Sequence, residues 1–122
     1  MTQKAETLDS VLRDLEAAVP QIQAAAIVSV EGLPIASILP ANVDETMIAA
    51  MTAAMLSLGE RAAAELNKGE LEQVYVKGKD GYIIVMGAGA NAVLTLSATK
   101  DVKLGLIFLE MERAAKKIAK LV

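Results

Sequence analysis

Residues 44–66 read DETMIAAMTAAMLSLGERAAAEL, and this stretch is apolar on more than one side. Ala, Met and Leu are strong helix formers and no proline interrupts them, so we predict one helix over the whole stretch. Asn42 or Asp44 can cap the start of this helix. Its apolar run, MIAAMTAAMLSL, contains only Thr52 and Ser57 as polar residues. The helix therefore has more apolar surface than one buried face requires.

A helix with about 3.6 residues per turn sorts these side chains into two stripes. The large-residue stripe consists of Met47, Ile48, Met51, Met55, Leu58, Ala62 and Leu66. The small-residue stripe consists of Ala49, Ala50, Ala53, Ser57 and Ala64. We predict that the large-residue stripe packs on the protein's own core. We predict that the small-residue stripe contacts the same helix of a second copy, because small side chains let two helix axes approach closely. The alternative is a solvated face that is rich in Ala only because Ala favours helix.

The composition is that of one domain, residues 1–122, with 54% hydrophobic and 22% charged residues. The apolar run of the central helix is shorter than the roughly 20 residues that span a membrane, so we expect no membrane insertion. The high apolar content then indicates surface that is buried between chains. A net charge of −3 and only three aromatic residues make nucleic acid an unfavourable partner.

The sequence contains no Cys and no His. This excludes disulfides, the usual zinc sites, thiol nucleophiles and histidine acid–base chemistry. We therefore expect no catalytic residues, no metal and no cofactor. The N-terminal residues lack the apolar segment of a signal peptide, so we expect a cytoplasmic protein.

The rest of the chain alternates between helical and strand patterns. We predict helices over 8–19 and 104–118, and strands over 24–30, 34–39, 72–78, 82–86 and 92–97. The order is α-β-β-α-β-β-β-α, which indicates an α/β (α+β) fold with one five-stranded antiparallel sheet. Because YIIVM, residues 82–86, is apolar on both sides, we expect helices on both faces of the sheet, a three-layer sandwich.

These segments resemble the Roadblock/dynein light chain domain family, and within it the short, stand-alone archaeal and bacterial members of the MglB-like type. The resemblance covers residues 8 to 118. It is carried by IVSVEGLPIAS at 27–37, by the helix that follows, by VYVKG at 74–78 with Gly81 and Tyr82, and by LGLIFLEMERAA at 104–115. The resemblance implies the sandwich described above, with a fold of the profilin and longin type.

The resemblance also implies a homodimer in which the third strand and the central helix pair with their copies. The residues expected at this interface are Ala49, Ala50, Ala53, Ala54, Ser57, Val74, Tyr75, Val76 and Lys77. Such dimers are platforms for small Ras-like GTPases. The residues expected to face the GTPase are Ser57, Glu60, Arg61 and Ala64.

Two classes of function follow. The first is a non-catalytic homodimeric scaffold or regulator that binds a small Ras-like GTPase and modulates its nucleotide state. The second is a profilin/longin-like sensor or structural module that self-assembles or binds a peptide or small ligand. An enzyme is disfavoured because no pair of nucleophile and base is visible. Arg61 could act in trans on GTP hydrolysis, but positioning or a surface salt bridge is the favoured interpretation.

Overall fold

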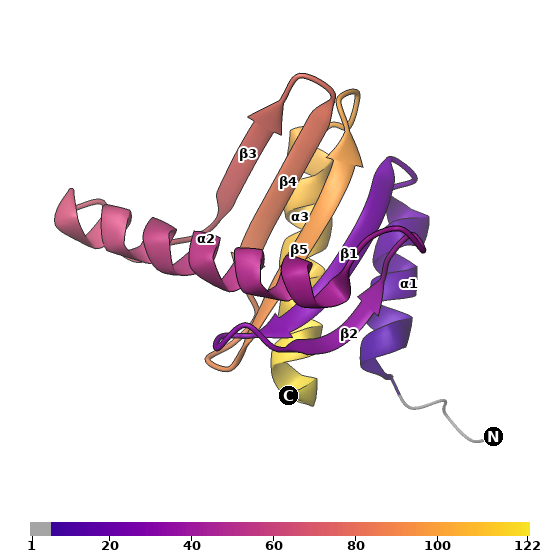
Figure 1. The fold of residues 1–122 in the computed structure, drawn as a ribbon, viewed down its shortest axis with the longest axis horizontal. Helices are drawn as coiled ribbons and strands as arrows, with labels where there is room; N and C mark the ends of the chain where they lie inside the picture. The colour runs from indigo at the N-terminus through magenta and orange to yellow at the C-terminus, as the bar shows by residue number, and fades with distance from the viewer. Residues whose placement is uncertain (1–5) are drawn as a thin grey trace.

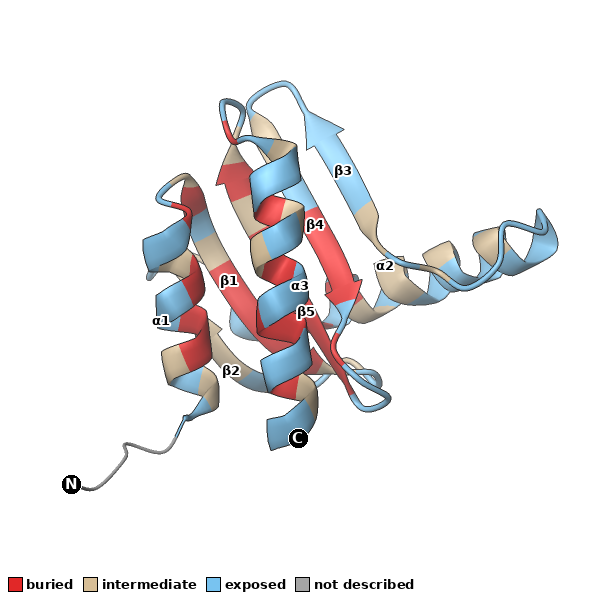
Figure 2. Ribbon diagram, turned by 180° about the vertical axis from the view of Figure 1, so that it is seen from behind, coloured by how far each residue is buried: buried red, intermediate tan, exposed pale blue. Residues whose placement is uncertain are grey.

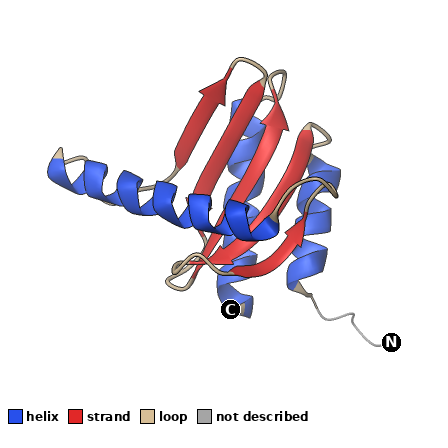
Figure 3. Cartoon of the chain, viewed as in Figure 1, coloured by secondary structure: helices blue, strands red, loops and turns tan. Residues whose placement is uncertain are grey.

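The computed structural model describes residues 6–122, which form three helices and five strands in the predicted order (Figure 1, Figure 3). The elements are α1 (Leu8–Ala18), β1 (Ile22–Ser29), β2 (Pro34–Ile38), α2 (Glu45–Glu65), β3 (Val74–Gly78), β4 (Gly81–Gly87), β5 (Ala92–Thr99) and α3 (Leu104–Leu121).

The five strands form one antiparallel sheet in the order β2-β1-β5-β4-β3. The hairpin β1–β2 and the meander β3–β4–β5 are joined by the pairing of β1 with β5, in which Ala26 lies opposite Thr95. β2 and β3 are the two edge strands. Pro34 begins β2, where its missing N–H does not interrupt a central ladder.

Helices cover both faces of the sheet, which confirms the predicted fold class. α1 and α3 lie on one face and α2 crosses the other (Figure 1, Figure 2). The main core lies between the sheet and the pair α1 and α3, where Leu12, Ile27, Ile84, Leu94 and Met111 are completely buried.

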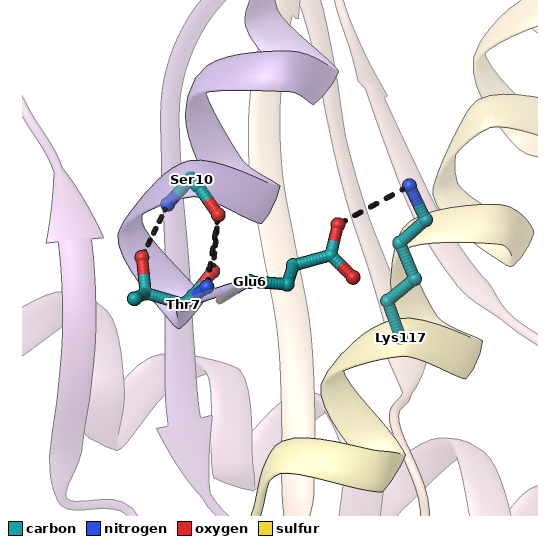
Figure 4. Close-up of polar contacts among 4 residues, drawn as sticks. All are labelled: Glu6, Thr7, Ser10 and Lys117. Atoms are coloured by element: carbon teal, nitrogen blue, oxygen red, sulfur yellow. Dashed lines mark hydrogen bonds and ion pairs between the residues drawn. The ribbon is translucent and has the colours of Figure 1, made fainter. Parts of the chain in front are cut away.

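A capping box fixes the start of α1 beside the end of α3 (Figure 4). The Thr7 hydroxyl accepts from the Ser10 backbone N–H at 3.1 Å, and the Ser10 hydroxyl accepts from the Thr7 N–H at 2.9 Å. These bonds satisfy two groups that a helix end leaves unpaired. Glu6 Oε2 lies 3.5 Å from Lys117 Nζ, so an ion pair joins the residue before the α1 cap to α3.

The central helix begins and ends where its sequence signals predict. The Asp44 carboxylate accepts from the Thr46 N–H at 2.9 Å and caps the helix. The Ser37 hydroxyl donates to Glu45, which anchors the first turn of α2 to β2. After Leu66 the chain turns away through Asn67, whose φ of 57° is left-handed.

Replacing Gly81 by Ala is expected to destabilise the fold by roughly 2–3 kcal/mol. A Cβ on Gly81 would lie 2.3 Å from the carbonyl oxygen of Ala98 in the neighbouring strand β5, and relieving this clash requires a shift of the backbone in the β4–β5 ladder. Gly87 is the matched control, since it also lies in β4 and a Cβ there meets no atom within 4 Å. Chemical denaturation of both variants tests this, and equal stability of the two would contradict it.

Candidate functional site

The inward face of α2 is built from small side chains. Ala49 and Thr52 are the buried residues of this helix, and Ala49 is completely buried. Ala49 packs with Ala26, Val28, Val85 and Val93 in a second, smaller core cluster. A Cβ on Gly32, in the β1–β2 turn, would lie 3.4 Å from the Cβ of Ala53, so this turn also approaches the helix closely. Part of the small-residue stripe therefore contacts the protein's own sheet and turn.

The large-residue stripe, in contrast, is largely exposed. The exposed fractions of Met47, Met51, Leu58 and Leu66 are 50%, 43%, 68% and 68%. The prediction that this stripe is the core face was wrong for these four residues and for Ala62, which is also exposed, whereas Ile48 and Met55 are half-buried. The reason is that a helix can approach a flat sheet closely only where its side chains are small, and this leaves the larger ones beside or above the contact.

The sheet surface next to the large-residue stripe is also open. Ile83 alternates with the buried Ile84, and it lies opposite Val76 in the β3–β4 ladder, so both side chains point to the α2 side. Their exposed fractions are 36% for Ile83 and 45% for Val76. The prediction that strand 82–86 is covered on both faces was therefore wrong at Ile83. Together, these exposed side chains form the open α2 face: Met47, Met51, Leu58, Leu66, Val76 and Ile83.

A small apolar cavity lies where the open α2 face meets the sheet. Its volume is about 70 Å³, and its lining includes Ile48, Met51, Met55, Ile83 and Leu96. The cavity continues the open α2 face below the helix.

The second half of α2 extends beyond the sheet (Figure 1). Its 21 residues span roughly 31 Å, whereas five strands at about 4.8 Å spacing are about 19 Å across. The overhang passes the edge strand β3, which pairs with β4 alone among the described strands. Gly59 lets the chain return close under the helix, because a Cβ there would lie 2.5 Å from Cγ2 of Val74.

The structure changes the expected interface at one residue. Ala49 was predicted to contact a second copy, but it is completely buried against its own sheet, so that prediction was wrong. Ala53 and Val74 are half-buried, and the others are exposed: Ala50, Ala54, Ser57, Tyr75, Val76 and Lys77. Their role at an interface stays a prediction.

The sequence reasoning missed Met47, Met51 and Leu58 as surface residues. These residues do form an apolar stripe in the sequence pattern. The pattern alone does not tell which of the two apolar stripes of the helix faces inward.

The residues expected to face a GTPase fall into two groups. Ser57 and Glu60 line a groove of about 740 Å³ between α2, the loop before β3 and the β4–β5 turn, together with Glu70 and Glu72. Among residues 6–122, no Lys or Arg lines this acidic groove. No local sequence signal indicates that the loop carboxylates Glu70 and Glu72 lie beside the helix, because their position depends on the path of the loop.

Arg61 and Ala64 are exposed on α2 and do not line this groove. The Arg61 side chain is 77% exposed, and its Nε lies 3.1 Å from Glu65 Oε1, one turn further along the helix. An exposed pair of this kind contributes only about 0.3–0.5 kcal/mol. Arg61 is thus engaged in a weak surface ion pair.

The described residues 6–122 contain no cluster of three side chains suited to hold a metal ion. Within the same residues, no helix combines the length and the apolar character that crossing a bilayer requires.

Asp101, in the β5–α3 connection, has its pKa lowered by the hydrogen bond that the Thr99 hydroxyl donates to its carboxylate. This carboxylate is not among the residues that line the acidic groove.

Comparison with known proteins identifies the family. Residues 8–98 match the Roadblock/LC7 domain. The uncharacterized protein MJ1340 of Methanocaldococcus jannaschii is 41% identical over 97 residues, which are 80% of this chain and 84% of that protein. The chain therefore belongs to the Roadblock/LC7 family.

Solved structures share its fold. The Roadblock/LC7 domain from Streptomyces avermitilis superimposes with a TM-score of 0.87 at 23% identity, covering 94% of this chain and 97% of that one. MglB from Myxococcus xanthus gives a TM-score of 0.86 at 20% identity, covering 97% and 96%. Profilin II from Acanthamoeba castellanii gives 0.63 at 19% identity, covering 93% and 94%, in agreement with the predicted profilin-like architecture.

Proposed function

We propose that this protein is a homodimeric scaffold that binds a small Ras-like GTPase and modulates its nucleotide state, without catalysing a reaction itself. The observation that carries the dimer is the open α2 face beside the free edge of β3. Soluble domains rarely leave several large apolar side chains together in contact with water. The GTPase as partner rests on family membership and on the resemblance to MglB-like members.

The proposed dimer pairs β3 antiparallel with β3 of a second copy. A two-fold axis perpendicular to the sheet generates this pairing, so the sheet continues across both copies and both α2 helices lie on the same face. The overhang of each α2 then lies over the sheet of its partner. It would cover Val76 and Ile83 there, while Met51 and Leu58 contact the other helix.

Two features of β3 favour this pairing. Its residues Val74–Gly78 contain no proline, and Lys77 is their only charged side chain, so little protects the edge from a second strand. The open α2 face lies on the side of the sheet where the α2 helix of the second copy would lie, so that helix could cover it. Full burial of one such side chain contributes roughly 1.5–3 kcal/mol, and each occurs twice in a symmetric dimer.

The acidic groove is the proposed contact for basic residues of the GTPase. Its carboxylates Glu60, Glu70 and Glu72 belong to no ion pair in the described part of the chain. Groove residues Ser57 and Glu60 lie on the side of α2 away from the large-residue stripe, so the proposed dimer leaves the groove open. Charges of one sign at a contact accelerate encounter and select partners of opposite charge.

Replacing Glu60 by Lys is expected to weaken GTPase binding by at least about tenfold, because it places a cation opposite the basic residues that the groove selects. Glu112 of α3 is the matched control, since it is exposed and lies outside the groove. Calorimetry of E60K and E112K with the cognate GTPase measures the effect. Equal affinities of the two variants would remove the groove from the proposed contact.

The partner class is tested by titrating the protein with each small Ras-like GTPase of the source organism, in its GDP form and with a GTP analogue. Binding of one of them, with a preference for one nucleotide state, is the expected result. Absence of binding for all of them in both states would favour the alternative, a profilin/longin-like module that self-assembles or binds a peptide or small ligand.

A further inference from the structure

The outward side of α3 carries leucines and cations on one face. At about 100° per residue, six exposed side chains fall within an arc of roughly 100°. They are Leu106, Leu109, Arg113, Lys116, Lys117 and Lys120. This set is called the basic–leucine face. The opposite side of the helix is buried against the sheet through residues that include Ile107, Met111 and Ile118.

In the described chain no element lies outside α3, on the side away from the sheet (Figure 2). Arg113, Lys116 and Lys117 border the open groove between α3 and α1. Leu106 and Leu109 are 42% and 46% exposed. Arg113 lies 3.3 Å from Glu110, and Lys117 pairs with Glu6, but both cations keep exposed side chains. Lys116 and Lys120 form no ion pair within residues 6–122.

Charge is unevenly distributed between the two sides of the molecule. Residues 113–122 contain four of the 12 Lys and Arg residues and no Asp or Glu, although the net charge of the chain is −3. Residues 31–80, which include α2, contain eight Asp and Glu and four Lys and Arg. The acidic side chains beside these cations are Glu6, which precedes α1 and pairs with Lys117, and Asp14 and Glu110, which line the groove between α1 and α3. The outer end of α3 is therefore a positive region on an acidic protein.

We infer that the basic–leucine face docks on an anionic membrane surface. A helix that lies on a bilayer presents cations to the lipid phosphates and inserts a few apolar side chains at the headgroup level. Leu106 and Leu109 lie on the same arc of α3 as the cations. One face of the helix could therefore contact lipid phosphates and insert apolar side chains at the same time. A bilayer fits better than nucleic acid, since the face offers no aromatic side chain for base stacking.

The position of the basic–leucine face on α3 agrees with the proposed dimer. The arrangement of two such faces in one dimer rests on that proposal. A two-fold axis perpendicular to the sheet places both α3 helices on one side and both α2 helices on the other. Two basic–leucine faces then lie on one side of the sheet, opposite the two α2 helices that carry Ser57 and Glu60 of the acidic groove. The dimer would present GTPase-binding surface to the solvent while it lies on the membrane.

The test is co-sedimentation of the full chain with vesicles of pure phosphatidylcholine and with vesicles containing about one third phosphatidylglycerol. Binding to the anionic vesicles is expected to be at least about tenfold stronger, and to decrease in high salt. Each basic residue near an anionic surface raises the affinity about fivefold, so the double variant K116Q/K120Q should bind roughly 20-fold more weakly. The double variant K68Q/K79Q removes the same charge elsewhere and should bind within about twofold of the wild type.

Equal binding to both kinds of vesicle, or equal loss in the two double variants, would overturn the inference. Retention on immobilised duplex DNA or an acidic peptide, without binding to anionic vesicles, would overturn it too and would assign the face to another class of partner. The result of the vesicle experiment does not depend on whether the proposed GTPase scaffold is correct. K116Q/K120Q should keep the dimer mass and the GTPase affinity, and a protein that proves monomeric should still distinguish the two kinds of vesicle.

Discussion

Replacing Met51 by glutamate is expected to convert the protein from a dimer into a monomer. Met51 is 43% exposed in the isolated chain and lines the apolar cavity under α2, so it lies where the exposed stripe of α2 meets the sheet. In the proposed dimer this position contacts the partner helix, and the two-fold axis places two new carboxylates in the same apolar contact. An unpaired buried charge costs roughly 3–5 kcal/mol, so the dissociation constant should rise by at least about 10³-fold.

Leu109 provides the matched control for this experiment. It is 46% exposed, close to the value of Met51, but it lies on the opposite side of the sheet on α3. L109E should therefore keep the dimer. Light scattering after size exclusion gives the masses, and circular dichroism verifies that both variants are folded. A dimeric M51E, or loss of the dimer in both variants, would remove the open α2 face from the interface.

The second large effect concerns the GTPase. One GTPase should bind per two chains, because a single partner that lies across a two-fold axis contacts the two copies unequally and blocks the equivalent position. The switch loops of Ras-like GTPases are ordered by the γ-phosphate and its Mg²⁺ and relax after hydrolysis. A scaffold that contacts these loops should bind one nucleotide state at least about tenfold more tightly, and by linkage it should shift the nucleotide affinity of the GTPase by the same factor.

Calorimetry gives both quantities, stoichiometry and nucleotide preference, in one set of titrations. The monomeric variant M51E supplies the control, since it should lose most of the binding if the GTPase requires both copies. A stoichiometry of one GTPase per chain, with equal affinity for both nucleotide states, would contradict the proposed scaffold.

Much of the fold follows from local sequence signals. The capping residue Asp44 and the left-handed Asn67 bracket α2 where the pattern places them, and the observed order of helices and strands is the predicted one. These features depend on neighbouring residues only. The strand order β2-β1-β5-β4-β3 was not predicted, because the pairing of β1 with β5 joins segments that are far apart in the chain.

The candidate site was harder to predict for a physical reason. Periodicity shows that α2 has two apolar stripes, but burial depends on how closely the helix approaches the sheet, and that distance is set by its partners. Ala49 is buried and Met51 is exposed because the helix lies directly on Val28 and Val93. Ala53, on the small-residue stripe, lies close to the turn at Gly32. A larger side chain at Ala53 would therefore disturb this contact within the chain, and it would not test the dimer interface alone.

The most direct test of the proposed dimer is the mass of the wild-type protein in solution, measured by sedimentation equilibrium over a range of micromolar concentrations. The expected result is twice the chain mass of 12.8 kDa, without dissociation across that range. A mass of 12.8 kDa at all these concentrations would show that the open α2 face and the edge of β3 are not covered by a second copy, and would contradict the proposal.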